Sequence, residues 1–162
     1  MRVMLIPIGS TGDVYPLVGL GVALRERGNE VEVVANSYYR LAIERAGLSF
    51  VELGTYEDMR RGLEDPDLWD RRKGFLVLGR AILPLMRPLY ETIARRYVPG
   101  ETIVVASSLA LSARLAQEKL GAPLVTVHLQ PTAFRSAYET PALLPWMFSH
   151  RRLRLPWKRF LD

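Results

Sequence analysis

The sequence predicts an α/β domain with a parallel sheet and helices on both faces. Short, continuous apolar runs of strand length recur along the chain, as is typical of strands buried on both faces of a parallel sheet. Segments with apolar residues at helical spacing lie between these runs, and glycine ends several of them. Hydrophobic residues make up 49% of the 162 positions, which is enough to bury the core of a single domain spanning residues 1–162.

Each element follows from this alternation, and the strand-helix-strand order implies right-handed crossovers. Strands are expected at residues 3–8, 31–35, 48–53, 102–106 and 123–128. Helices are expected after a turn at residues 9–16 and at residues 38–46, 72–96 and 109–120. Ser37 is the expected N-cap of the second helix, and Pro84 and Pro88 predict a kink in the third because proline removes an internal hydrogen bond. Residues 54–70, rich in charges and turn formers, are expected to form a loop with room for one short helix.

Composition excludes several classes of protein. The chain has no cysteine and only two histidines, so disulfides and a zinc site are not expected, and no metal is assigned. The lack of cysteine fits a reducing compartment, and we expect a cytoplasmic protein. The first apolar run is too short for a signal peptide, and charges and prolines interrupt the apolar stretch at residues 75–89, so no membrane-spanning helix is expected.

Positive charge is concentrated near the end of the printed sequence. Residues 146–162 carry five basic side chains against one acidic side chain, which accounts for +4 of the net charge of +5. The same segment holds four aromatic residues: Trp146, Phe148, Trp157 and Phe160. One interpretation is a helix whose aromatic side chains pack inward, and the alternative is peripheral contact with an anionic membrane through residues 146–160. The remainder is almost neutral and has no nucleic-acid recognition motif, so no nucleic-acid partner is expected.

Candidate site residues follow the predicted strands. In an open parallel sheet, ligands bind beyond the carboxyl ends of the strands. The candidates for ligand binding there are Gly9, Ser10, Thr11, Gly12, Ser107, Ser108, His128 and Gln130. Aromatic residues in neighbouring segments, Trp69 and Phe134 together with Tyr56 and Phe75, are candidates for the wall of a hydrophobic pocket, although ordinary packing is the favoured interpretation for any single one of them.

The turn after the first strand reads GSTGDVYP. Its G-x-x-G spacing differs from the dinucleotide fingerprint G-x-G-x-x-G, and Asn36 stands where a ribose-binding acid is expected. No lysine precedes Lys73, which excludes a phosphate-binding loop here, and Ser10 does not lie in G-x-S-x-G. Asp13 is left with two interpretations: an N-cap, with Pro16 tolerated in the first helical turn, or a general base.

Two stretches resemble a known family. Residues 9–36 read GSTGDVYPLVGLGVALRERGNEVEVVAN, and residues 106–138 read ASSLALSARLAQEKLGAPLVTVHLQPTAFRSAY. The first is similar to the opening of the acceptor-binding domain of GT-B glycosyltransferases, in the group containing sterol glucosyltransferases, rhamnosyltransferases and glycopeptide glycosyltransferases. Their motif G-[ST]-x-G-D-[VT]-x-P is present in full, and Asn29 replaces the histidine of their RGHEV step. The second stretch resembles their helix, strand and following polar loop.

The resemblance implies a Rossmann-like domain, the N-terminal half of a GT-B fold. It also implies transfer of a sugar, with inversion and without a metal, from a nucleotide sugar (UDP- or dTDP-sugar) to an acceptor hydroxyl. The candidate site residues named above are then expected to bind the acceptor or the donor sugar, and the aromatic ones favour a hydrophobic acceptor. The acid after the first strand is the family's proposed base, and this role maps onto Asp13. Some relatives pair a histidine with an aspartate after the fourth strand; because Ser107 and Ser108 stand there, Asp13 would act alone.

The family's donor-binding motif is not found in this sequence. We therefore expect no cofactor bound by this chain alone, an acceptor domain incomplete at its C-terminal end, and an inactive isolated chain. The expected partners are a small-molecule or lipid acceptor and a donor-binding domain, supplied in cis or by a separate chain. The alternative function is a non-catalytic binding or membrane-docking subunit that recruits a catalytic partner.

Overall fold

The computed structural model describes residues 1–70 and 72–130, so the basic aromatic segment at residues 146–162 and its membrane interpretation lie outside it. The core of the described chain is a five-stranded parallel sheet with the order β3-β2-β1-β4-β5. Its strands are β1 (Arg2–Ile6), β2 (Glu30–Ala35), β3 (Ser49–Glu52), β4 (Thr102–Ser107) and β5 (Leu124–Val127). All the strands were expected from apolar runs, and their parallel pairing confirms the predicted fold class.

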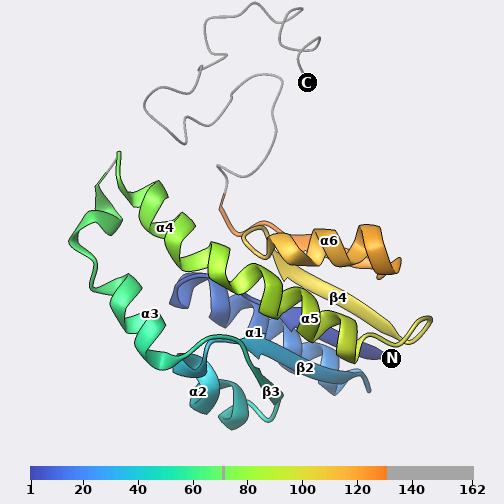
Figure 1. Cartoon of the computed structure of the whole chain (residues 1–162). Helices are drawn as coiled ribbons and strands as arrows, with labels where there is room; N and C mark the ends of the chain where they lie inside the picture. The colour runs from blue at the N-terminus through green and yellow to red at the C-terminus, as the bar shows by residue number, and fades with distance from the viewer. Residues whose placement is uncertain (71, 131–162) are drawn as a thin grey trace, which may run out of the picture.

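Six α-helices and three short 3-10 helices connect the strands in the described residues (Figure 1). The α-helices are α1 (Thr11–Glu26), α2 (Arg40–Arg45), α3 (Tyr56–Leu63), α4 (Gly74–Ile82), α5 (Met86–Arg96) and α6 (Leu111–Leu120). The 3-10 helices are η1 (Ser37–Tyr39), η2 (Pro66–Trp69) and η3 (Leu83–Leu85). Residues 54–70, expected to be a loop with room for one short helix, contain both α3 and η2.

Helices cover both faces of the sheet because the strand side chains alternate in direction. On one face, Met4 and Ile6 of β1 pack with Leu89 and Ile93 of α5 and with alanines of α6. On the other face, alternate residues of β1 and β2 pack with α1 and with the η1 and α2 segment, in a cluster of Val3, Leu5, Val14, Val18, Val31, Val33, Ala35, Tyr39 and Ile43. The central strand β1 is thus buried from both sides, as its uninterrupted apolar sequence predicts.

Two local predictions were wrong. α1 begins at Thr11, so Pro16 lies inside the helix rather than in its first turn. The cap before η1 is Asn36, whose side chain accepts a hydrogen bond from the Tyr38 backbone N–H at 2.9 Å, and not Ser37. The predicted break in the long helical stretch is present at Pro84, which lies in η3 between α4 and α5, whereas Pro88 lies within α5.

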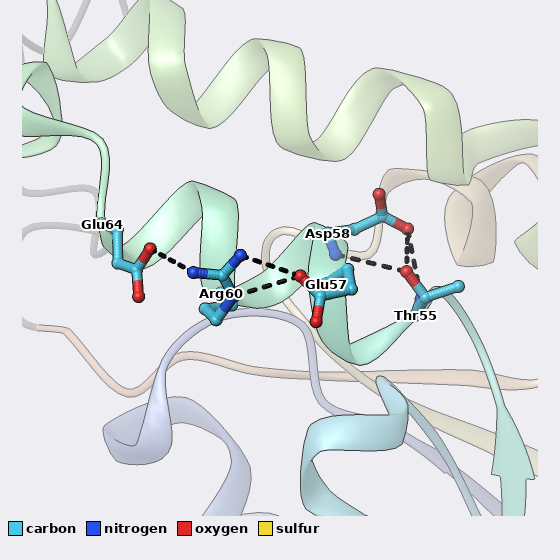
Figure 2. A network of polar contacts seen from close by, with 5 residues as sticks. All are labelled: Thr55, Glu57, Asp58, Arg60 and Glu64. Carbon is cyan, nitrogen blue, oxygen red and sulfur yellow. Dashed lines mark hydrogen bonds and ion pairs between the residues drawn. The ribbon is translucent and has the colours of Figure 1, made fainter.

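The first turn of α3 contains a reciprocal cap (Figure 2). The Thr55 hydroxyl donates to Asp58 Oδ2 at 2.6 Å and accepts from the Asp58 backbone N–H at 3.2 Å. Arg60 adds ion pairs with Glu57 and Glu64 along the exposed surface of the helix. The Thr55 hydroxyl, followed by the Thr55 backbone N–H, lowers the pKa of Asp58, because both donors favour the ionised carboxylate.

None of the helices in the described residues is both long enough and apolar enough to cross a membrane. The observation agrees with the interrupted apolar stretch at residues 75–89.

Candidate active site

The carboxyl ends of three neighbouring strands bring the candidate residues to one rim of the sheet. Ile6 of β1 pairs with Ala106 of β4, and Ser107 pairs with Val127 of β5. The turn that follows β1, the end of β4 and the segment after β5 therefore lie together. This rim is the part of an open α/β sheet where ligands bind.

The glycine-rich turn holds Asp13 at the third position of α1, not at the N-cap. Ser10 is the N-cap residue, and Asp13 Oδ2 accepts hydrogen bonds from the Ser10 backbone N–H at 2.8 Å and from the Ser10 hydroxyl at 3.1 Å. Gly9 has a φ of +137°, and a Cβ at this position would overlap the Asp13 carboxylate. Glycine is thus required at position 9 for two reasons, its backbone conformation and the closeness of the carboxylate.

The second oxygen of the Asp13 carboxylate is contacted from the other end of the described chain. Gln130 Nε2 donates a hydrogen bond of 2.7 Å to Asp13 Oδ1, although the two residues are 117 positions apart. Asp13 therefore accepts three hydrogen bonds, two at Oδ2 and one at Oδ1. The sequence predicted both residues as site residues but did not predict that they touch.

Ser107 forms hydrogen bonds with the backbone just before the glycine-rich turn. Its hydroxyl accepts from the Ile8 backbone N–H at 3.0 Å and donates to the Ile8 carbonyl oxygen at 3.3 Å. The ladder of paired residues between β1 and β4 ends at Ile6 and Ala106, and the next residue, Pro7, has no N–H to donate. The side chain of Ser107 thus continues the connection where the backbone cannot. Ser108 is half-buried and makes no side-chain hydrogen bond within the described part of the chain.

Four tyrosines form a row of ring contacts beside this turn. Tyr39 is buried, with 2% of its surface exposed, and its hydroxyl lies 3.4 Å from the Gly9 carbonyl oxygen. Its ring meets those of Tyr15 and Tyr38 edge to face, and Tyr38 stacks on Tyr56 at 5.4 Å between centroids. Burial raises the pKa of Tyr39, and the nearby negative charge of Asp13 adds to this effect. Tyr15, Tyr38 and Tyr56 are about half exposed, so the row presents aromatic surface to solvent.

The remaining residues that the sequence predicted for the site do not all lie beside Asp13. Thr11 hydrogen-bonds to the Tyr39 hydroxyl, and Gly12 lies in the first turn of α1. His128 follows β5 and precedes Gln130 by two positions. Trp69 ends η2 with 84% of its surface exposed. Phe134 lies outside the described residues.

No group of three or more histidine, aspartate or glutamate side chains within residues 1–70 and 72–130 is arranged to hold a metal ion.

Of these four tyrosines, only Tyr56 was predicted from the sequence as a site residue, and Tyr15, Tyr38 and Tyr39 were missed. Tyr38 and Tyr39 directly follow Asn36 and Ser37 at the end of β2, and hence lie on the same rim. Applying the carboxyl-end argument to the second strand would have identified them.

A parallel sheet with helices on both faces, carrying a glycine-rich turn and a carboxylate at its carboxyl rim, defines a Rossmann-like domain of the GT-B type. The chain belongs to glycosyltransferase family 28, whose N-terminal domain matches residues 3–139.

Individual relatives agree with this assignment. The chain is 48% identical over 50 residues to O-mycaminosyltylonolide 6-deoxyallosyltransferase of Streptomyces fradiae, covering 31% of this chain and 12% of that protein. It is 32% identical over 150 residues to glycosyltransferase GtfE of Amycolatopsis orientalis, covering 87% of this chain and 34% of that protein. A sterol 3-beta-glucosyltransferase of Arabidopsis thaliana is 26% identical over 100 residues, covering 62% of this chain and 15% of that protein.

Among solved structures, glycosyltransferase SsfS6 of Streptomyces sp. SF2575, crystallised with thymidine diphosphate, is similar with a TM-score of 0.60 and 27% identity. The match covers 79% of this chain and 38% of SsfS6. The chain therefore spans well under two thirds of the length of these relatives.

Proposed function

We propose that this chain is the acceptor-binding half of an inverting glycosyltransferase that uses a nucleotide sugar, with Asp13 as the general base. The observation that carries the proposal is the position of the Asp13 carboxylate. It lies at the ligand-binding rim, and Oδ1 accepts only one hydrogen bond among the described residues. A carboxylate oxygen can accept two, so Oδ1 retains a position for an acceptor hydroxyl.

In the proposed step, the acceptor hydroxyl donates its proton to Asp13 Oδ1 as its oxygen attacks the anomeric carbon of the sugar. The new bond forms on the face opposite the leaving group, so the configuration inverts. The bond between the anomeric carbon and the diphosphate oxygen breaks, and the nucleoside diphosphate leaves with the electron pair. Ser10 and Gln130 hold the carboxylate in one orientation, which favours proton transfer along a defined direction.

The nucleotide donor is assigned to a region beyond this chain. The family match and the thymidine diphosphate in SsfS6 support a nucleotide sugar such as a UDP- or dTDP-sugar. The match covers only 38% of SsfS6, which supports the proposal that a donor-binding domain is supplied in cis or by a separate chain. The isolated chain is accordingly expected to be inactive. The chain has no cysteine, and we propose a cytoplasmic location for the complete enzyme.

The acceptor is proposed to be apolar. Tyr15, Tyr38 and Tyr56 are about half exposed, and the rings of Tyr15 and Tyr38 both contact buried Tyr39, whose hydroxyl lies near the turn that holds Asp13. Farther along the chain, Trp69 and Phe75 are also exposed. Aromatic side chains bind apolar ligands well because they bury much surface at a small cost in rotamer entropy.

The test is sugar transfer by the complete enzyme, or by this chain mixed with its donor-binding half, across a panel of nucleotide sugars and apolar alcohols. Asp13→Asn retains the size of the side chain but removes the base, and we expect kcat to fall by about 10²- to 10⁴-fold.

Asp58→Asn is the matched control, because Asp58 occupies the equivalent capping position of α3 (Figure 2). Its kcat should remain within about twofold of the parent enzyme, since it alters only a surface cap. Full activity of Asp13→Asn would contradict the base assignment. Absence of transfer by the parent with every donor and acceptor would favour the alternative, a non-catalytic binding or membrane-docking subunit.

A further inference from the structure

The contact between Gln130 and Asp13 joins two elements that the chain keeps far apart. Asp13 lies in the first turn of α1, and Gln130 lies three residues after the end of β5. Their hydrogen bond of 2.7 Å is short for an amide donor, as is usual when the acceptor is charged. Asp13 is half-buried and Gln130 is exposed, and neither belongs to the hydrophobic core.

The two carboxylate oxygens of Asp13 have different roles in this arrangement. Oδ2 accepts both hydrogen bonds from Ser10 and belongs to the helix cap. Oδ1 has Gln130 as its donor among the described residues. Because an ionised carboxylate only accepts hydrogen bonds, the amide must present its NH₂ group to Oδ1, and Gln130 Oε1 is directed elsewhere.

We propose that Gln130 is a positioning residue for Asp13, an inference that rests on the proposed role of Asp13 as the base. Gln130 occupies one acceptor position of Oδ1 and thereby confines the acceptor hydroxyl to the other. Gln130 thus fixes the direction from which Asp13 accepts the proton.

The first experiment records the carbon-13 NMR signal of the Asp13 carboxyl at neutral pH in this chain, with three variants. Gln130→Leu removes the donor, and we expect the signal to move because Oδ1 loses its hydrogen bond. Gln130→Glu replaces the donor by a group that only accepts hydrogen bonds and should move the signal as well. Gln117→Leu is the matched control, because Gln117 is partly exposed on α6 and makes no side-chain hydrogen bond in the described chain.

The second experiment measures kcat and the KM for the acceptor in the complete enzyme. With Gln130→Leu, kcat should fall several-fold because the carboxylate is less well oriented, whereas KM should stay within about twofold of the parent enzyme. Gln117→Leu should change neither kcat nor KM. Circular dichroism of each variant verifies that the fold is retained.

The two experiments separate the inference from the function on which it rests. If Gln130→Leu leaves the Asp13 carboxyl signal where the control has it, the positioning role is wrong, whatever Asp13 does in catalysis. If Gln130→Leu keeps the kcat of the parent while Asp13→Asn loses it, the positioning role is wrong and the base assignment stands. If Asp13→Asn also keeps full kcat, Asp13 is not the base, which overturns the proposed function and the role of Gln130 with it.

Discussion

Replacing Ser107 by alanine should detach the turn that carries Asp13 from β4. Ser107 is 5% exposed, and its hydroxyl makes two hydrogen bonds with the backbone of Ile8, at 3.0 Å and 3.3 Å. Alanine leaves the Ile8 N–H without its partner, and such a loss costs about 1–3 kcal/mol in a buried setting. Because Ile8 is only partly buried, water can replace part of the contact, and we expect a loss of about 1–2 kcal/mol.

The measurement is urea unfolding followed by circular dichroism, with a thermal scan alongside. For a chain of this size, about 1–2 kcal/mol corresponds to a decrease in Tm of about 2–8 °C. Ser108→Ala is the control, because the adjacent serine makes no side-chain hydrogen bond in the described residues, and its effect should stay within about 0.5 kcal/mol. Equal free energies of unfolding for the two variants would refute the argument that the Ser107 side chain replaces the missing backbone ladder.

Two further predictions concern packing and pH. A Cβ at Gly74 would overlap the Leu68 carbonyl oxygen, whereas one at Gly79 meets nothing within 4 Å. Gly74→Ala should therefore speed amide hydrogen exchange in α4, and Gly79→Ala should slow it. Exchange rates that change in the same direction in both variants would contradict this prediction. Burial raises the pKa of Tyr39 above its ordinary value of 10.0. As pH rises, the unfolded chain therefore releases this proton before the folded chain does, and the free energy of unfolding falls until the pH passes the pKa of Tyr39 in the folded state. Between about pH 9 and about pH 11, Tyr39→Phe should therefore lose less free energy of unfolding than the control Tyr90→Phe, and an equal loss would count against a buried phenol.

The sheet was predictable because its signals are local. The apolar runs of β1, β2 and β4 have no competing interpretation, since a strand buried on both faces needs no polar side. The helix starts were less predictable. Asp13 at the head of α1 was expected either to cap the helix or to serve as a base, yet the cap is Ser10, and Asp13 completes it from the third position. A reciprocal cap involves two residues, here Ser10 and Asp13, and each of them taken alone predicts a different first residue for the helix.

The sequence by itself determined the alternation of strands and helices, the rim at which their carboxyl ends meet, and the presence of a single carboxylate in the turn after the first strand. Only the tertiary structure decided what that carboxylate touches. The contacts of Gln130 with Asp13 and of Ser107 with Ile8 join residues 117 and 99 positions apart. Parallel pairing predicts which segments are neighbours, but a hydrogen bond depends on the strand register and on the conformation of the turn at Gly9, and neither is encoded in a local pattern.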